Sequence, residues 1–134
     1  MTSLGLVITQ FYEELAEEME AVALEKLDSR TAELAETVYV RGVYDTPLAA
    51  DRLARRENID AVAVLGAVIT GDTDHDQVVA RTAASKLSDV SLNRDTPVTF
   101  GIIGPGMSSP EAYERIEYGA EAIPIALKLV SELP

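Results

Sequence analysis

The sequence predicts an α/β fold, a three-layer α/β/α sandwich built on a four-stranded parallel sheet, and two observations lead to it. Four short apolar runs alternate along the chain with four segments whose apolar residues recur at helical spacing. The third run, residues 61–69, is apolar throughout, as expected for a central parallel strand covered on both faces. Right-handed crossovers between such strands place helices on both faces of the sheet. The 134 residues fit one domain, residues 1–134.

The first half of the chain supplies two strands and two helices. An apolar run at residues 4–9 predicts the first strand, and β-branched and aromatic side chains at residues 36–40 predict the second. Between them, apolar side chains recur every three to five residues among glutamates, which predicts an amphipathic helix over residues 11–28. Thr46 followed by a proline is typical of a helix N-cap and first helical position, so the second helix covers residues 48–57.

The third strand, residues 61–69, is followed by a helix at residues 75–92 and a fourth strand at residues 97–103. The apolar side chains of this helix share one face, which we expect to point toward the sheet. They are Val78, Val79, Ala83, Leu87 and Val90.

The last helix is expected to run to about residue 132 and to be kinked at Pro124, because proline removes a helical hydrogen bond. Ser108 and Glu111 have the spacing of a capping box at its start, and Ser109 before a proline offers an alternative cap. The side chains expected to face the core are Tyr113, Ile116, Ala120, Ile123, Leu127 and Val130.

For this alternation we expect the strand order 2-1-3-4, the flavodoxin-like arrangement. Ligands of such sheets bind beyond the carboxyl ends of the strands, at the switch point between the first and third strands. The loops that meet at this edge are residues 10–11, 42–45, 67–75 and 104–109. The sequence therefore predicts one binding site assembled from segments that are far apart in the chain.

Composition excludes several classes of function. The formal net charge of −12, from 23 acidic and 11 basic residues, argues against binding to nucleic acid or to anionic membranes. No apolar run fits a signal peptide or a membrane span, so we expect a cytoplasmic protein. With no cysteine and one histidine, we expect no metal site. The acidic, lysine-poor composition suits either a protein that works in high salt or an ordinary acidic cytosolic enzyme.

The most informative segment is residues 65–76, an apolar run that breaks at Gly71 and restarts as a helix carrying His75. A strand, a glycine turn and a helix N-terminus present backbone N–H groups and the positive end of the helix dipole to an anion. The segment therefore predicts a phosphate site beside an acid–base imidazole, and a plain turn with a solvent-exposed histidine is the alternative. Asp72 and Asp74 would repel a phosphate unless their carboxylates turn outward or cap the helix.

Three other side chains at these loops each have two interpretations. Phe11 is either the first core residue of its helix or a ring that stacks on a flat heterocycle. Asp45 is either a helix N-cap or a carboxylate that accepts hydrogen bonds from a polyol or an amine. Arg115 either pairs with Glu111 at the surface or holds a phosphate. The residues alone thus predict an α/β domain that binds a small phosphorylated ligand and has one acid–base histidine.

Four segments resemble the lumazine synthase family in its archaeal branch: residues 7–11, 42–49, 65–76 and 97–102, the last followed by Glu114 and Arg115. They match in order over nearly the whole chain; the third is highly specific, whereas the first would be weak alone. The resemblance implies a step of riboflavin biosynthesis. In that step 5-amino-6-(D-ribitylamino)uracil condenses with 3,4-dihydroxy-2-butanone 4-phosphate to give 6,7-dimethyl-8-ribityllumazine, phosphate and water.

By motif position, the resemblance implies that Phe11 stacks on the pyrimidine ring and that His75 is the proton donor. The residues implied to hold the ring and the ribityl chain are Val43, Tyr44, Asp45, Ala67, Val68 and Ile69, with Phe100 reaching in from the neighbouring subunit. The residues implied to hold the phosphate are Gly71, Asp72, Thr73 and, again from the neighbour, Arg115. The family needs no metal or organic cofactor, binds two small-molecule substrates and forms pentamers, which some members assemble into a capsid of twelve pentamers.

One departure from the family concerns the segment after Arg115. Many bacterial members carry lysines there, whereas residues 117–121 contain none, which leaves Arg115 as the main expected cation for the phosphate. Two alternatives stay open: an archaeal-type riboflavin synthase, and a non-catalytic shell protein that binds flavin or lumazine. A riboflavin synthase has no phosphorylated substrate, so the intact loop that ends at His75 favours lumazine synthase.

Overall fold

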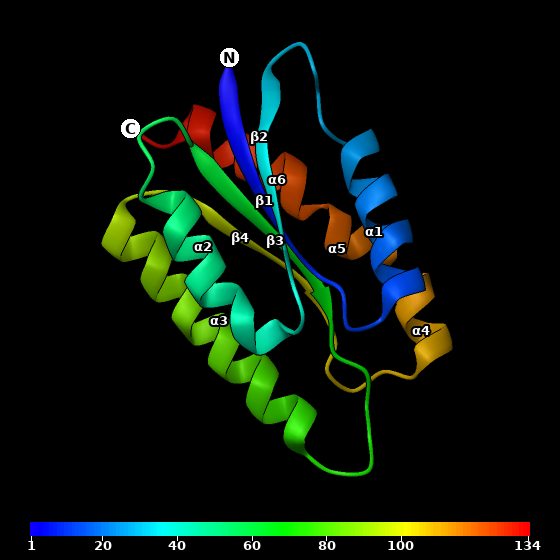
Figure 1. Ribbon diagram of the computed structural model, residues 1–134. Helices are drawn as coiled ribbons and strands as arrows, with labels where there is room; N and C mark the ends of the chain where they lie inside the picture. Colours follow the sequence, from blue (N-terminus) through cyan, green and yellow to red (C-terminus); the bar gives the residue numbers. More distant parts are fainter.

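The computed structural model describes residues 1–134, and its centre is a four-stranded parallel sheet in the order β2-β1-β3-β4 (Figure 1). The strands are β1 (Thr2–Thr9), β2 (Ala32–Val40), β3 (Ala61–Ala67) and β4 (Val98–Ile103). Every residue of β3 is buried, as expected for a strand with neighbours on both sides and helices on both faces. The predicted fold class and strand order are confirmed.

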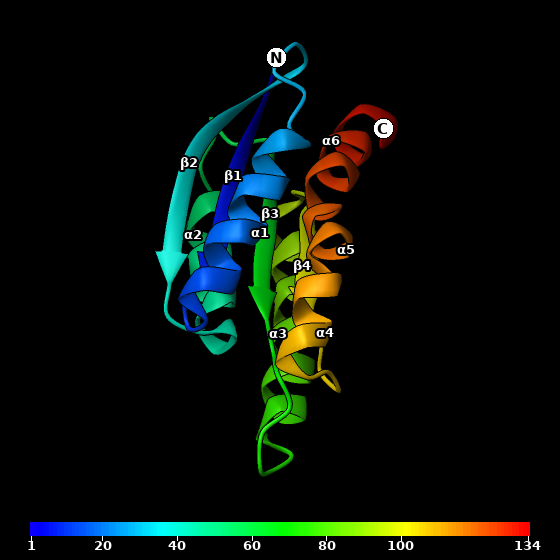
Figure 2. The same cartoon turned by 90° about the vertical axis from the view of Figure 1, so that its right-hand side faces the viewer.

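Helices cover both faces of the sheet (Figure 2). One face carries α2 (Thr46–Ala54) and α3 (His75–Arg94), and the other carries α1 (Glu13–Glu25), α5 (Ile116–Ala120) and α6 (Ala122–Glu132), with α4 (Ser109–Glu114) leading into α5. A single 3₁₀ turn, η1 (Val43–Asp45), joins β2 to α2. None of the helices is both long enough and apolar enough to span a bilayer.

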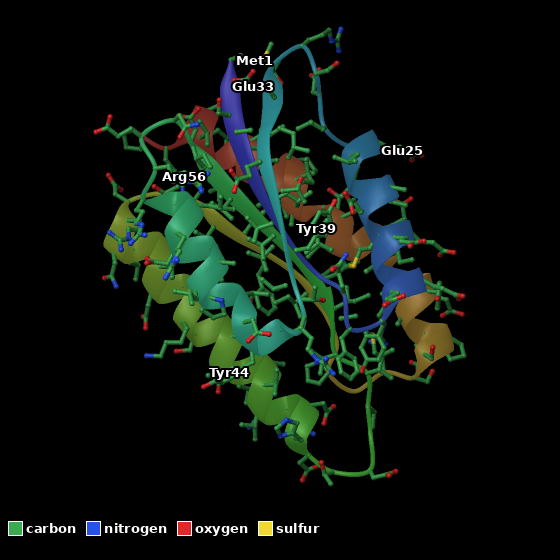
Figure 3. The ribbon with its side chains drawn as sticks, viewed as in Figure 1. Met1, Glu25, Glu33, Tyr39, Tyr44 and Arg56 are labelled. Carbon is green, nitrogen blue, oxygen red and sulfur yellow. The ribbon has the colours of Figure 1, made fainter.

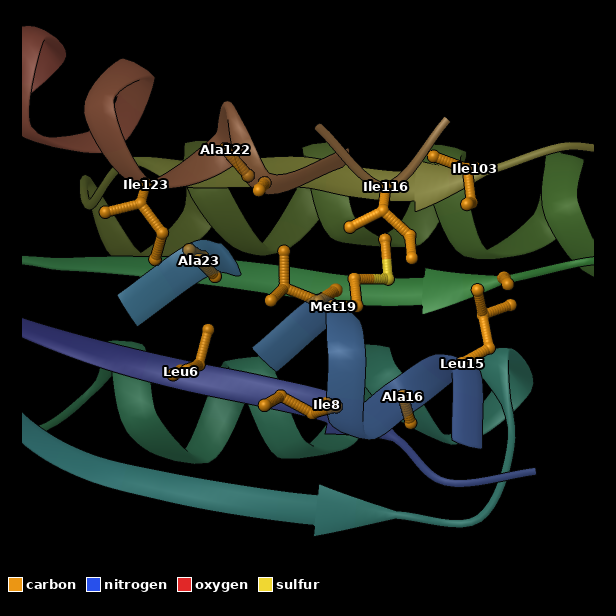
Figure 4. Close-up of a cluster of buried hydrophobic side chains, with 14 of the residues drawn as sticks. Leu6, Ile8, Leu15, Ala16, Met19, Ala23, Ile103, Ile116, Ala122 and Ile123 are labelled. Atoms are coloured by element: carbon orange, nitrogen blue, oxygen red, sulfur yellow. The ribbon is translucent and has the colours of Figure 1, made fainter. Parts of the chain in front are cut away.

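Two apolar cores result from the alternation of side chains along the strands. Leu6 and Ile8 of β1 point to the face covered by α1, where Met19 packs against them (Figure 4). Val7, between them in sequence, points to the opposite face and packs in the core beneath α2 and α3. Fully burying a side chain of this size stabilises the fold by about 1.5–3 kcal/mol, so the two cores hold the strand ends in fixed relative positions.

All four strands run in the same direction, so their carboxyl ends lie together at the lower edge of the sheet in Figure 1. Both chain termini lie toward the opposite end. The connections that leave the carboxyl ends are the loops that the sequence predicts to meet.

Several element bounds differ from the prediction. α1 begins at Glu13 rather than Phe11, because Phe11 and Tyr12 form a bend that leads the chain away from β1. β2 begins four residues earlier than predicted, since it pairs with β1 along the full length of both strands. That pairing adds an amphipathic edge segment whose polar side chains hide its strand character in the sequence.

The predicted continuous last helix is wrong. The chain forms three helices that are interrupted at Arg115 and at Glu121, and Arg115 leaves helical geometry with φ −102° and ψ 5°. Pro124 is the third residue of α6, where its missing N–H has no helical partner to lose. Proline therefore sits within the first turn of a new helix and does not kink an old one.

Two side chains expected to face the core are exposed: Val78 on α3 is 62% exposed and Tyr113 on α4 is 37% exposed. The capping box of Ser108 and Glu111 is confirmed, with Glu111 N donating to Ser108 Oγ at 3.3 Å and Ser108 N donating to Glu111 Oε1 at 3.1 Å. The alternative cap at Ser109 is therefore wrong, because Ser109 is already the first helical residue.

Candidate active site

A cavity of about 420 Å³ lies at the carboxyl ends of the strands, where four segments meet. Its lining residues are Phe11, Tyr12, Arg41, Gly42, Val43, Tyr44, Asp45, Ala67, Val68, Ile69, Gly71, Thr73, His75, Asp76 and Val79. They come from the β1–α1, β2–α2 and β3–α3 connections and from the first turns of α3. Three of the four loops predicted to meet therefore line one cavity, whereas the fourth, residues 104–109, contributes no lining residue.

An exposed aromatic ring forms one part of the cavity. Phe11 is 58% exposed, so the interpretation that it is a core residue is wrong. Tyr12 meets the Phe11 ring edge-on, with ring centroids 4.9 Å apart and ring planes at 80°. A phenylalanine that stays exposed beside a cavity has apolar surface available for a flat ligand.

The turn after β2 is held by two side-chain hydrogen bonds. Asp45 Oδ2 accepts from Gly42 N at 3.1 Å, and Thr46 Oγ1 donates to Val43 O at 2.8 Å. Thr46 is buried and is the first residue of α2, so the predicted N-cap role of Thr46 is wrong. Asp45 occupies the cap position without a side-chain bond to α2, and its carboxylate folds back on the turn.

The Tyr44 side chain of this turn is 69% exposed, and Asp45 beside it is also exposed. Tyr44 lies low in Figure 3, where the turn approaches α3. The turn therefore presents a phenol and a carboxylate, that of Asp45, at the edge of the cavity.

The segment that follows β3 stays extended without belonging to the strand. β3 ends at Ala67 rather than at residue 69, but Val68 N donates to Ile103 O at 2.9 Å and Thr70 N donates to Met107 O at 2.9 Å. Gly104 adopts φ +92°, and a Cβ there would collide with the Val68 carbonyl oxygen. A glycine at position 104 thus lets the β4–α4 connection pack against the floor of the cavity.

The loop from Gly71 to α3 offers unpaired backbone donors. The N–H groups of residues 71–74 and of Asp76 form no hydrogen bond within the chain, whereas His75 N donates to Thr73 Oγ1 at 3.2 Å. Together with the positive end of the 20-residue α3, these donors form the kind of environment that binds anions. Of the predicted phosphate residues in this loop, Gly71 and Thr73 line the cavity and Asp72 does not.

The carboxylates around this loop are arranged differently from the expectation. Asp72 and Asp74 are exposed and lie outside the lining, whereas Asp76, one residue past His75, belongs to it. The predicted repulsion of a phosphate by Asp72 and Asp74 is reduced accordingly, because water surrounds both carboxylates. His75 is exposed and lines the same cavity as Phe11 and Asp45.

Phe100 and Arg115 do not join this cavity within one chain. Phe100 lies on β4 and is 45% exposed, and Arg115 borders a separate hollow of about 380 Å³ with Pro105 and Tyr118. The Arg115 guanidinium is 3.4 Å from Glu111 Oε2, so the surface ion pair is formed. The pKa of Glu111 lies below its ordinary value, mainly because Ser108 N donates to its carboxylate and also because Arg115 is near.

Five lining residues were not assigned a part in the site from the sequence: Tyr12, Arg41, Gly42, Asp76 and Val79. Tyr12, Gly42 and Asp76 are sequence neighbours of assigned residues, so adjacency was the available signal. No group of three or more His, Cys, Asp or Glu side chains is arranged to hold a metal ion.

The geometry agrees with comparisons against known proteins. Residues 2–133 match the family model described as 6,7-dimethyl-8-ribityllumazine synthase. This chain belongs to the lumazine synthase family. It is 59% identical over 133 residues to the 6,7-dimethyl-8-ribityllumazine synthase of Halobacterium salinarum, a match that covers 99% of this chain and 100% of that protein.

Two further lumazine synthases match over the same length. That of Halorubrum lacusprofundi is 56% identical over 133 residues, which are 99% of each chain. That of Methanocaldococcus jannaschii is 42% identical over 133 residues, which are 99% of this chain and 94% of that one. The resemblance inferred from four motifs therefore extends over the whole lumazine synthase chain.

Proposed function

We propose that this protein is an active lumazine synthase, which condenses 5-amino-6-(D-ribitylamino)uracil with 3,4-dihydroxy-2-butanone 4-phosphate to 6,7-dimethyl-8-ribityllumazine, phosphate and water. The observation that carries the proposal is the single cavity lined by Phe11, by the turn ending at Asp45 and by the loop from Gly71 to His75. The exposed ring of Phe11 suits a flat heterocycle, the carboxylate of Asp45 suits a polyol, and the loop from Gly71 to His75 suits a phosphate. One cavity contains all three.

The pyrimidine substrate binds at the Phe11 side of the cavity. Its uracil ring stacks on the exposed face of Phe11, so that binding removes apolar surface of Phe11 from water. Val43, Tyr44 and the segment Ala67, Val68 and Ile69 border the same space and hold the ring and the ribityl chain. The second carboxylate oxygen of Asp45, which accepts no hydrogen bond within the chain, is available to a ribityl hydroxyl or a substrate amine.

The phosphate substrate binds at the loop before α3. The unpaired N–H groups of residues 71–74 supply donors, and the hydroxyl of Thr73 and the helix dipole add to them. These groups stabilise the charge that gathers on the phosphate as it leaves. Asp72 contributes through its backbone N–H, because its side chain lies outside the cavity lining.

His75 transfers protons in the reaction. The substrate amine attacks the ketone to form an imine with loss of one water, phosphate is eliminated, and the ring closes with loss of a second water. Each step moves a proton or releases an anion, and an imidazole can both donate and accept a proton. The two substrates are held in one cavity, so proximity supplies a further part of the rate.

The neighbouring subunit completes the site. Neither Arg115 nor Phe100 lines the cavity that holds His75: Arg115 borders a separate hollow, and Phe100 is exposed on β4. In a ring of identical subunits, one face of each subunit meets the other face of the next. A pentamer built this way brings Arg115 to the phosphate and Phe100 to the pyrimidine ring of the adjacent subunit's site.

Mixing the purified protein with both substrates tests the proposal. We expect lumazine absorbance to appear together with one phosphate released for each lumazine formed. A riboflavin synthase would leave this mixture unreacted and would consume added lumazine without phosphate release, and a non-catalytic shell protein would bind added lumazine without turnover. Either of these results would overturn the proposal.

The role of His75 has a test of its own. His75→Ala should lower kcat by about 10²-fold or less, since general acid–base catalysis contributes about 10²–10⁴-fold and the substrate amine is already nucleophilic. His75 is exposed at the start of α3, so its replacement should leave the thermal midpoint close to that of the wild type. An unchanged kcat would remove His75 from the mechanism.

A further inference from the structure

Arg41 lies in the cavity and has no role in the mechanism above. It is the only lysine or arginine among the lining residues and follows directly after β2. The chain carries 23 acidic residues, yet the Arg41 guanidinium forms no salt bridge and no hydrogen bond with any side chain. Its close neighbour is an aromatic ring.

The Arg41 Cζ atom lies 5.8 Å from the centroid of the Phe11 ring, over its face. This distance is within the range of a cation–π contact. Tyr12 approaches the edge of the same ring. Phe11 lies outside every helix and strand and is 58% exposed, so these two contacts restrict a side chain that is otherwise surrounded by solvent.

The sheet register brings Arg41 to Phe11. β1 and β2 end as a pair, Thr9 opposite Val40, and Gln10 N donates to Val40 O at 2.8 Å. Phe11 is the next residue after the donor of this last hydrogen bond, and Arg41 is the next residue after its acceptor. Backbone pairing therefore fixes where both residues leave the sheet.

We infer that Arg41 is a positioning residue for the pyrimidine substrate, because it holds the Phe11 ring in the orientation on which that substrate stacks. A planar guanidinium can lie flat on one face of a ring and leave the opposite face to a base. An unrestrained ring would have to give up rotamer freedom whenever the substrate binds. The inference rests on the proposed function, since it takes the pyrimidine substrate as the ligand of Phe11.

Steady-state kinetics of Arg41→Met test the inference, because methionine keeps an unbranched side chain and removes the charge. We expect the KM for 5-amino-6-(D-ribitylamino)uracil to rise about two- to fivefold, the equivalent of one exposed cation–π contact. The kcat and the KM for the butanone phosphate should not change. Arg41→Lys should recover part of the loss, because the ammonium group keeps the charge without the planar fork.

A matched control is Arg52→Met, which removes the same charge from an exposed position of α2 outside the cavity. Both KM values should stay at those of the wild type. If Arg52→Met raised the KM for the pyrimidine as much as Arg41→Met does, the effect would come from net charge and the inference would be overturned.

A double-mutant cycle with Phe11→Leu decides whether Arg41 acts through the ring. With leucine at position 11, Arg41→Met should cause no further rise in the KM for the pyrimidine substrate. An equal rise in both backgrounds would overturn the inference. A rise in the KM for the butanone phosphate would also overturn it and would make Arg41 an anion ligand.

Calorimetric titration with 6,7-dimethyl-8-ribityllumazine gives the same cycle without turnover. Its Kd should rise about two- to fivefold in Arg41→Met and should show the same dependence on Phe11. A wild-type protein that binds lumazine but does not form it would overturn the proposed function and still test Arg41. A wild-type protein that neither forms nor binds lumazine would overturn both.

Discussion

Arg115 and His75 belong to different surfaces of one chain, and this separation leads to a prediction about mixed oligomers. Arg115 borders the hollow beside Pro105 and Tyr118, whereas His75 lines the main cavity, and the two sets of lining residues share no member. If each active site takes His75 from one subunit and Arg115 from the next, two impaired variants can complement each other.

The first perturbation is Arg115→Ala, and the structure predicts little effect on stability. The ion pair with Glu111 spans 3.4 Å between side chains that are 43% and 48% exposed, so its loss costs about 0.3–0.5 kcal/mol. The capping box of Ser108 and Glu111 does not involve Arg115 and stays intact. Urea denaturation should therefore give nearly the wild-type midpoint, while the KM for the butanone phosphate rises.

The second perturbation is His75→Ala, co-expressed in equal amounts with Arg115→Ala so that the subunits mix at random. A site is intact when its His75 comes from an Arg115→Ala subunit and its Arg115 comes from a His75→Ala subunit. Each condition holds for about half of the sites, so about one quarter of wild-type activity should return. Phosphate release, assayed at a butanone phosphate concentration near the wild-type KM, measures this recovery.

Two controls make the result decisive. The same variants purified separately and mixed after assembly should show no recovery until the subunits exchange. Lys128→Ala removes an equal charge from an exposed position of α6 and should not lower activity; co-expressed with His75→Ala, it should give only the mean activity of the two variants. Co-expressed subunits with no activity above the mean of the two variants would refute the shared site.

Three further predictions concern stability. Gly101→Ala should lower the free energy of unfolding by about 1–3 kcal/mol, because its Cβ would lie 2.5 Å from the Gly119 carbonyl oxygen. In the control Gly71→Ala the new Cβ meets open space, so the urea midpoint should change little. Equal midpoints for the two variants would contradict the packing argument. Arg94 donates to both oxygens of Asp51, at 2.8 and 3.0 Å, and these bonds hold the pKa of Asp51 below its ordinary value. That stabilisation is present above the unfolded pKa of about 3.9 and is lost as pH falls through the lower folded pKa. Asp51→Asn should therefore lose less stability than the wild type below pH about 4. Parallel acid-unfolding curves for the two proteins would contradict this role of the Asp51–Arg94 pair. Because the net charge is −12, the thermal midpoint should rise between low and molar salt, and a constant midpoint would exclude charge repulsion as a major cost.

The sequence was sufficient for the order of strands and helices. Apolar periodicity identifies β3 and α3 clearly, because buried parallel strands are apolar throughout and helices repeat every 3.6 residues. The carboxyl-end rule then predicts that the loops carrying Phe11, Asp45 and His75 meet, as they do. These inferences depend on the local residue pattern, which can be read from the sequence, and on the handedness of crossovers, which is the same in nearly all chains.

The interruptions of the last helix could not be read in this way. Its apolar spacing continues across Arg115 and Glu121, yet the helix breaks at both because α5 has to pack closely on β4, where Gly101 and Gly119 meet. Proline at position 124 is a strong signal in isolation, but its meaning depends on where the preceding break falls. Close packing between elements that are distant in sequence set that position.

The sequence by itself determined the fold class, three loops of the cavity and the position of the loop that we propose binds the anion, because each depends on residues that are neighbours in the chain. The tertiary structure decided which side chains meet across the site. It aligned Arg41 with Phe11 through the register of β1 and β2, and it turned Arg115 to a different face. Such contacts follow from strand pairing and helix packing, and they cannot be predicted from a local residue pattern.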